Sequence, residues 1–187
     1  MMSSADVVDF YTQLQNLGIV IWLDGGWAVD ALLGEQTRPH EDLDIAIQEK
    51  DVSKVCELLE SQGYKDVPRD DTGPWSFVLG DDKGHEIDFH IIVFDDKGNG
   101  IYGPLEKKSM YPAASLIGKG TLDGRPVKCI SAEYMVKFMA PWLNKHGAKY
   151  VKAISALCER FDIDYPAEYR HLKKSDLTSA KQNDHRH

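Results

Sequence analysis

The sequence has little of several features that would place the protein in a specialised class. Only three of its 187 residues are cysteine, and these lie far apart and are odd in number, which argues against a disulfide framework and fits a reducing cytosol. No run reaches the roughly 18 apolar residues that cross a bilayer. Residues 1–6 lack the basic flank and apolar core of a signal peptide. We therefore expect a cytoplasmic protein with no membrane partner.

Positive charge is also scarce. The chain has 22 Lys and Arg residues against 30 Asp and Glu residues, which gives a net charge of -8. A dedicated nucleic-acid binder presents a basic face, so this balance disfavours nucleic acid as a partner and favours cationic ligands. Hydrophobic residues make up 42% and charged residues 28% of the chain, which is ordinary for a globular protein and excludes overall disorder.

Hydrophobic periodicity in the first 130 residues predicts alternating helices and strands. Apolar residues at helical spacing indicate helices, and short apolar or alternating runs indicate strands. The expected helices cover residues 6–17, 27–33 and 51–62, and the expected strands cover residues 19–23, 43–47, 75–79, 86–94 and 127–130. Asp6 is the expected cap of the first helix. Residues 80–84 are typical of a hairpin turn, and residues 101–124 allow only short strands because prolines and glycines interrupt them.

The C-terminal part is expected to be helical. One helix should run from Ser131 to about Asn144, kinked or shortened by Pro141, and a second should cover residues 148–161. Residues 173–187 are polar and charged, and we expect them to be disordered. The fold class is therefore α/β (α+β), a mixed sheet flanked by helices. The expected divisions are a domain over residues 1–130, a helical segment over 131–172 and a tail over 173–187.

Two aspartates mark the strand expected at residues 43–47. Side chains alternate along a strand, so Asp42 and Asp44 share one face while Leu43 and Ile45 point into the core. Neighbouring carboxylates repel each other unless a positive charge lies between them. Mg²⁺ prefers oxygen ligands and would resolve that repulsion, whereas a solvated strand edge is the alternative interpretation.

A second acidic strand follows at residues 86–94. Glu86, Asp88 and His90 fall on its polar face. If this strand lies beside residues 43–47 with its polar face turned the same way, three or four carboxylates converge. Such a cluster is what two-metal phosphoryl or nucleotidyl transfer requires, because one metal holds the phosphates and the other lowers the pKa of the attacking hydroxyl.

A zinc or iron site is an alternative reading of the same strand. His85, Asp88 and His90 together contain the histidine ligands that such metals prefer. That reading leaves the Asp-x-Asp pair of the earlier strand unexplained. The oxygen-rich cluster is therefore the favoured hypothesis.

A glycine pair, Gly25 and Gly26, comes directly after a buried strand and before a helix. Glycine allows the backbone to approach an anion closely, and the free amides at a helix start attract phosphate. A glycine pair is also common in tight turns, and this one matches neither the P-loop nor the dinucleotide-binding pattern. The pair is informative only in combination with the acidic strands.

In this order, the three features resemble the nucleotidyltransferase superfamily related to DNA polymerase beta. The sequence is most similar to the small antibiotic nucleotidyltransferases that modify lincosamides or aminoglycosides. Residues 22–30, 38–44 and 87–90 carry the resemblance, which continues more weakly through residues 125–131. Fifteen residues separate Gly26 from Asp42, which is long for the superfamily and similar to the antibiotic-modifying branch.

The resemblance implies roles for the acidic residues and the glycines. Asp42 and Asp44 would be metal ligands. Asp88 would be the third carboxylate, a general base toward the acceptor hydroxyl and a further metal ligand. Gly25 and Gly26 would bind the triphosphate.

Four further residues have two readings each. Arg38 would neutralise phosphate charge or be a surface cation, and His40 would contact phosphate or order the loop before the strand. Glu86 and His90 would contact the acceptor or hold Asp88 in place. We include all four in the predicted site, Arg38 and His40 toward the nucleotide and the other two toward the acceptor.

The resemblance therefore implies a magnesium-dependent nucleotidyltransferase. With two Mg²⁺ ions, it would move a nucleoside monophosphate from ATP or another nucleoside triphosphate to a hydroxyl of a small molecule, and release pyrophosphate. The expected acceptor is a lincosamide or aminoglycoside antibiotic. The alternative is a non-catalytic module of the same fold, acting as an antitoxin or regulatory partner, and the presence of all three acidic residues counts against it.

Overall fold

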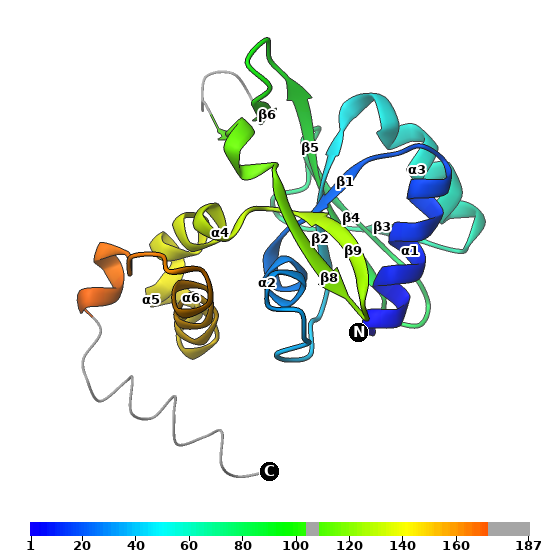
Figure 1. Ribbon diagram of the computed structural model, residues 1–187. Coiled ribbons are helices and arrows are strands. Elements are labelled where there is room, and N and C mark those ends of the chain that lie inside the picture. The colour runs from blue at the N-terminus through cyan, green and yellow to red at the C-terminus, as the bar shows by residue number, and fades with distance from the viewer. Residues whose placement is uncertain (104–108, 172–187) are drawn as a thin grey trace. The chain divides into compact units, whose positions relative to one another are not determined.

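A computed structural model of the protein describes residues 1–103 and 109–171 (Figure 1). The contacts group the chain into two units, one over Met1–Ser131 and one that begins at Ala132, and each is described by itself. The expectation for residues 173–187 lies outside the described residues.

One mixed sheet organises the first unit. Its strands follow the order β3-β4-β5-β2-β1-β9-β8. Outside this order, β6 pairs with β5, and β7 pairs with β6. They are β1 (Ile21–Leu23), β2 (Leu43–Gln48), β3 (Lys65–Val67), β4 (Ser76–Gly80), β5 (Glu86–Phe94), β6 (Gly100–Tyr102), β7 (Met110–Tyr111), β8 (Gly118–Leu122) and β9 (Arg125–Cys129). β2 pairs with β5 in parallel and with β1 antiparallel, and β4 and β5 form the predicted hairpin. The mixed sheet of the prediction is confirmed.

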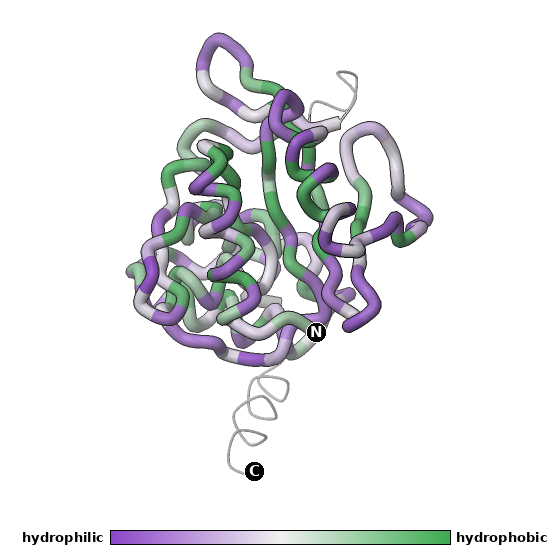
Figure 2. The backbone as a smooth tube through the Cα atoms, turned by 90° about the vertical axis from the view of Figure 1, so that its right-hand side faces the viewer, coloured by the Kyte–Doolittle hydropathy of each residue, from purple (hydrophilic) through white to green (hydrophobic). Residues whose placement is uncertain are grey.

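Helices cover both faces of this sheet. They are α1 (Ser4–Asn16), α2 (Gly25–Leu33) and α3 (Glu49–Ser61), with a 3₁₀ turn, η2 (Ala113–Ser115). α2 packs against β2, β8 and β9, and α3 packs against β2 and β5. Figure 1 shows α1 and α3 on one side of the sheet and α2 on the other. The central strands are largely hydrophobic, whereas the outer turns are mostly hydrophilic (Figure 2).

The two central strands, β2 and β5, are buried along most of their length. Five of their side chains are completely buried: Leu43, Ile45 and Ile47 of β2, and Ile87 and Phe89 of β5. Neighbouring strands on both sides satisfy their backbone groups, so no sheet edge is exposed there. A polar side chain on these strands therefore lies in the interior of the unit, where it needs a partner.

The first helix begins earlier than its apolar spacing predicts. Ser3 is the N-cap, and Asp6 is not the cap but the third helical residue of a capping box. The Ser3 Oγ accepts from the Asp6 amide at 3.2 Å, and the Asp6 carboxylate accepts from the Ser3 amide at 2.8 Å. The prediction of Asp6 as cap was wrong because the box satisfies two helix-start amides where a single cap satisfies one.

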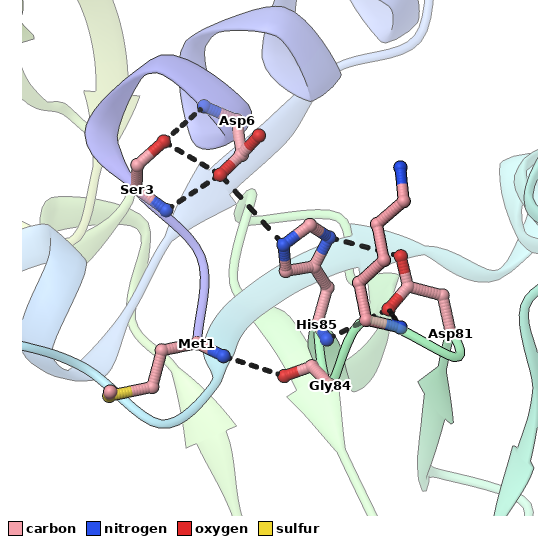
Figure 3. Close-up of polar contacts among 7 residues, drawn as sticks. Met1, Ser3, Asp6, Asp81, Gly84 and His85 are labelled. Carbon is pink, nitrogen blue, oxygen red and sulfur yellow. Dashed lines mark hydrogen bonds and ion pairs between the residues drawn. The ribbon is translucent and has the colours of Figure 1, made fainter.

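Contacts to the β4–β5 turn hold the start of α1 (Figure 3). The Met1 amino group donates to the Gly84 carbonyl at 2.8 Å. His85 lies between two carboxylates, with Nδ1 at 3.0 Å from Asp81 and Nε2 at 3.9 Å from Asp6. A segment at the start of the chain is thereby joined to the hairpin that carries β5.

The second unit is helical in its described part, as expected. It comprises α4 (Ala132–Met139), η3 (Ala140–Trp142), α5 (Leu143–His146), α6 (Ala148–Phe161) and η4 (Ala167–His171). α4 ends at Met139 and a 3₁₀ turn containing Pro141 follows, because proline lacks the amide that would continue an α-helix. Pro141 therefore shortens the helix as predicted, and α6 has the predicted bounds. No helix in the described part of the chain is long and apolar enough to cross a membrane.

We expect Ser3→Ala to lower the free energy of unfolding by about 1 kcal/mol, because the first turn of α1 loses its cap. The midpoint of thermal unfolding should fall by about 2–4 °C for a chain of this size. Ser4→Ala is the matched control, since Ser4 lies inside the helix. Equal midpoints for the two variants in a calorimetric scan would contradict the role given to the capping box.

Candidate active site

Two aspartates face each other across the central strands. In the parallel pairing of β2 with β5, Asp44 is in register with Asp88, and Ala46 with His90. The predicted adjacency of the two acidic strands is therefore confirmed. Residues in register on neighbouring strands point to the same face, and so do residues two apart on one strand. As a result, one ligand atom each from Asp44, Asp88 and His90 lies within 4.8 Å of the others.

Negative charge is concentrated in this group. Burial, followed by the charge of Asp42, raises the pKa of Asp44 to about 7. Burial also raises the pKa of Asp88, with Asp42 adding to the effect. The Oδ1 atom of Asp88 is buried and has no hydrogen-bond partner. An unpartnered carboxylate oxygen among half-buried acidic groups is a donor set that fits a divalent cation.

Asp42 lies at the margin of this group. It directly precedes β2, whose ladder begins at Leu43, and it is half-buried. Its charge raises the pKa of both Asp44 and Asp88, so its carboxylate acts on the same small region. It is not one of the three residues whose ligand atoms converge. The two members of the Asp-x-Asp pair thus have different positions.

His90 is tied to residues from distant parts of the chain. Its Nδ1 lies 2.6 Å from the Tyr111 hydroxyl, and that hydroxyl donates to Oδ2 of Asp24 at 2.7 Å. Burial alone would lower the pKa of His90. The hydrogen bond and charge of Asp24, together with the charges of Asp44 and Asp88, outweigh it and raise the pKa to about 9. The ring is thus held on one side by a hydrogen-bond chain and faces carboxylates on the other.

The glycine pair forms the start of α2, directly against the acidic group. Asp24 caps this helix by accepting from the Gly25 amide at 2.7 Å. Its pKa is lowered although burial opposes this, because His90, Tyr111 and the Gly25 amide stabilise the carboxylate. Gly25 has a φ of 55°, and a Cβ atom there would lie 1.9 Å from Oδ2 of Asp44. Only glycine combines that dihedral angle with that proximity.

The other predicted nucleotide-binding residues gather at the second glycine. A Cβ on Gly26 would lie 2.2 Å from Nδ1 of His40 and 2.9 Å from an Nη atom of Arg38. Both side chains therefore come close to the first turn of α2, although they are 12 or more residues further along the chain. The guanidinium of Arg38 is half-buried and donates to the Pro39 carbonyl at 2.9 Å. Gly26, Arg38 and His40 thus lie close together at the start of α2.

His40 is also part of a buried pair that orders its loop. Its Nε2 lies 2.5 Å from Oδ2 of Asp30, and the two residues are 2% and 0% exposed. Asp30 also accepts from the amide and the hydroxyl of Thr37. The His40 ring packs on Trp27, with ring centroids 4.6 Å apart. The loop-ordering interpretation of His40 follows from these contacts, and its contact with a nucleotide stays a prediction.

Two other candidates have partners outside the three converging residues. Glu86 is paired with Arg69, and 29% of its side chain is exposed. His85 contacts Asp81 and Asp6 at the turn (Figure 3). The alternative zinc or iron site made of His85, Asp88 and His90 was therefore wrong, because the hairpin turn directs His85 to a different cluster.

Sequence reasoning missed two members of the site, Asp24 and Tyr111. Asp24 carried a usable signal, because an aspartate directly before Gly-Gly at a strand-to-helix junction is a typical N-cap. Tyr111 lies in the two-residue strand β7, inside the stretch where prolines and glycines hide any period. Only tertiary structure brings it beside His90.

Gly25→Ala should lower the unfolding free energy by more than the roughly 1–2 kcal/mol that a left-handed backbone costs an L-residue, because its Cβ would also overlap the Asp44 carboxylate. Gly18→Ala is the control. Gly18 has a similar positive φ, and no atom lies within 4 Å of its added Cβ. The measurement is the midpoint of chemical unfolding for each variant.

The same comparison in an Asp44→Ala background isolates the overlap. With the carboxylate removed, the cost of Gly25→Ala should fall toward that of Gly18→Ala. A cost that stays the same in both backgrounds would mean that the overlap with Asp44 is not what requires glycine.

The raised pKa of Asp44 predicts a pH dependence of stability in metal-free buffer. Between about pH 4 and pH 7 the folded state retains a proton on Asp44 that the unfolded state has lost, so this residue makes stability fall as pH rises. Asp44→Asn should remove that contribution. The difference in unfolding midpoint between wild type and variant should therefore change across this range. Parallel midpoint curves for the two proteins would show that Asp44 titrates normally.

Comparison with known proteins connects this geometry to a family. The model of the aminoglycoside-2''-adenylyltransferase family matches residues 6–150. A lincosamide resistance protein of Staphylococcus haemolyticus is 30% identical over 124 residues, which are 66% of this chain and 76% of that protein. A 2''-aminoglycoside nucleotidyltransferase of Escherichia coli is 28% identical over 146 residues, 73% of this chain and 77% of that protein.

A solved structure supports the same relationship. A lincosamide antibiotic adenylyltransferase, crystallised with lincomycin bound, has a TM-score of 0.71 and 25% sequence identity to this chain. The match covers 83% of this chain and 98% of that one. The resemblance found in the sequence is thereby confirmed, as is the fold class. The chain belongs to the aminoglycoside-2''-adenylyltransferase family and is a nucleotidyltransferase.

Proposed function

We propose that the protein transfers the AMP group of ATP, or the corresponding group of another nucleoside triphosphate, to a hydroxyl of a lincosamide or aminoglycoside antibiotic. The observation that carries the proposal is the register of β2 with β5, which sets Asp44 opposite Asp88 beside the glycine start of α2. The similarity to a lincosamide resistance protein and to a 2''-aminoglycoside nucleotidyltransferase supports these acceptor classes. We assign this chemistry to residues 1–130.

The acidic group would hold the divalent metal on which such transfer depends. Asp44 and Asp88 supply converging oxygens, one of them unpartnered, and Asp42 supplies a third carboxylate at the margin. We propose two Mg²⁺ ions here, since a two-ion site stabilises both the attacking and the leaving oxygen of an in-line displacement. When bound, Mg²⁺ neutralises the phosphate oxygens and the charge that develops on the leaving pyrophosphate.

The start of α2 would bind the triphosphate. Backbone amides at a helix start carry partial positive charge and attract phosphate oxygens. Gly25 and Gly26 leave that backbone uncovered by side chains, and the guanidinium of Arg38 lies next to Gly26. His40 holds the Arg38 loop in place through its buried pair with Asp30. These residues would orient the α-phosphorus toward the carboxylates.

Asp88 would act as the general base. It accepts the proton of the acceptor hydroxyl, the hydroxyl oxygen forms a bond to the α-phosphorus, and the bond to the bridging oxygen breaks so that pyrophosphate leaves. A carboxylate whose pKa is raised by burial is a better proton acceptor near neutral pH. Glu86, two residues before Asp88 and partly exposed, remains the proposed acceptor contact. His90 has a ligand atom within 4.8 Å of those of Asp44 and Asp88, which favours a role toward the metal rather than the acceptor.

The test is pyrophosphate release with ATP, Mg²⁺ and either lincomycin or tobramycin. Asp42→Asn, Asp44→Asn and Asp88→Asn should each lower the rate on the order of 100-fold or more, the usual size of a lost general base or charge-stabilising group. Mass spectrometry should show the acceptor gaining one adenylyl group, and the acceptor that gains it identifies the class.

Glu41→Gln is the matched control, because Glu41 is an exposed acid beside Asp42 and its loss should leave the rate unchanged. A wild-type rate in Asp44→Asn or Asp88→Asn would refute the assignment of the site. Folded protein that shows no metal-dependent ATP binding would support the non-catalytic module, and protein that binds ATP and Mg²⁺ but modifies neither antibiotic would indicate another acceptor. The similarity to a 2''-aminoglycoside nucleotidyltransferase and to a lincosamide adenylyltransferase favours the transferase.

A further inference from the structure

His90 belongs to a hydrogen-bond chain that the proposed reaction does not use. The chain runs from His90 Nδ1 to the Tyr111 hydroxyl at 2.6 Å and from that hydroxyl to Oδ2 of Asp24 at 2.7 Å. Tyr111 is 6% exposed and Asp24 is 8% exposed. Three polar side chains from β5, β7 and the cap of α2 thus make contact with little access to water.

The direction of each hydrogen bond follows from the donors available. An ionised carboxylate can only accept, and a tyrosine hydroxyl has one hydrogen to donate. Because the Tyr111 hydroxyl donates to Asp24, its oxygen is left to accept from His90. This hydrogen bond therefore keeps a proton on Nδ1 whether the ring is protonated or neutral, so that in the neutral ring the lone pair is on Nε2.

The Nε2 atom faces the acidic group. It lies 3.8 Å from Oδ1 of Asp88, the buried oxygen that has no hydrogen-bond partner. Side-chain ligand atoms of His90, Asp44 and Asp88 lie within 4.8 Å of one another. A histidine that binds a metal usually donates its other ring N–H to a second group, which fixes the tautomer and the ring orientation. In this protein the Tyr111 hydroxyl accepts the Nδ1–H of His90, and Asp24 in turn accepts from that hydroxyl.

We propose that His90 is a metal ligand through Nε2, and that Tyr111 and Asp24 are positioning residues that fix its tautomer. The inference rests on the metal site proposed at Asp44 and Asp88. A nitrogen ligand suits first-row transition ions better than Mg²⁺, which prefers oxygen. The site is therefore expected to bind Mn²⁺ more tightly than an all-carboxylate site would. Replacing His90 should remove this gain in Mn²⁺ affinity.

Electron paramagnetic resonance of Mn²⁺ bound to the full chain tests this without any catalysis. In the wild-type protein, spin-echo spectra should show coupling of Mn²⁺ to a ¹⁴N nucleus. His90→Gln and His90→Asn should abolish the coupling and weaken Mn²⁺ binding more than Mg²⁺ binding. His40→Asn should leave the coupling in place, since His40 is held by Asp30.

The positioning residues are tested by conservative changes. Tyr111→Phe and Asp24→Asn should each weaken Mn²⁺ binding on the order of 10-fold, the size expected when the partner of a ligating histidine is lost. Tyr102→Phe is the matched control. The Tyr102 ring lies 5.3 Å from that of His90 and 6.0 Å from that of Tyr111, and its hydroxyl is not in the chain. Its Mn²⁺ affinity should equal that of wild type.

The outcomes separate this inference from the proposed function. Mn²⁺ binding that depends on Asp44 but shows no ¹⁴N coupling in wild type, or coupling that persists in both His90 variants, overturns the role of His90 and retains the carboxylate site. No Mn²⁺ binding by a folded wild-type protein overturns both. Loss of affinity in Tyr102→Phe equal to that in Tyr111→Phe would overturn the positioning role. Circular dichroism confirms folding for each variant.

Discussion

The parallel pairing of β2 with β5 is the constraint on which the rest of the structure depends. Their register sets Asp44 opposite Asp88 on two central strands whose apolar residues are mostly buried. Burial of these carboxylates, together with the nearby charge of Asp42, costs free energy, which appears as raised pKa values for both. The fold tolerates this cost because surrounding hydrophobic burial is extensive, and a bound cation would remove it.

The backbone at the start of α2 lies very close to the side chains of the site. Both glycines lie where a Cβ would overlap a functional side chain, Asp44 in one case and His40 in the other. The helix start can therefore lie directly beside the carboxylates. A phosphate bound to these amides would be within reach of the groups proposed to act on it, which is why the glycine pair and the acidic strands form one site.

Two buried polar arrangements support that site from opposite sides. Asp30 and His40 order the loop that carries Arg38, and Asp24 and Tyr111 hold the ring of His90. Buried hydrogen bonds of this kind cost little when every group is paired, and they fix side-chain directions more narrowly than apolar packing does. Each arrangement includes a residue of α2 or its cap, Asp30 in one case and Asp24 in the other. This short helix therefore connects the proposed nucleotide-binding residues to the proposed metal ligands.

The sequence alone determined the main helices, the two acidic strands and most of the chemistry, but it did not reveal the three-residue strand β3. Alternation placed Asp44 and Asp88 on polar faces of two strands, and a glycine pair before a helix indicated the anion site, because these signals depend on residues near one another in the chain. It could not determine the strand register, the marginal place of Asp42, or the contact of Tyr111 with Asp24, which is 87 residues away. Those depend on which segments pack together, and packing is decided by the burial of the whole apolar set rather than by any local pattern.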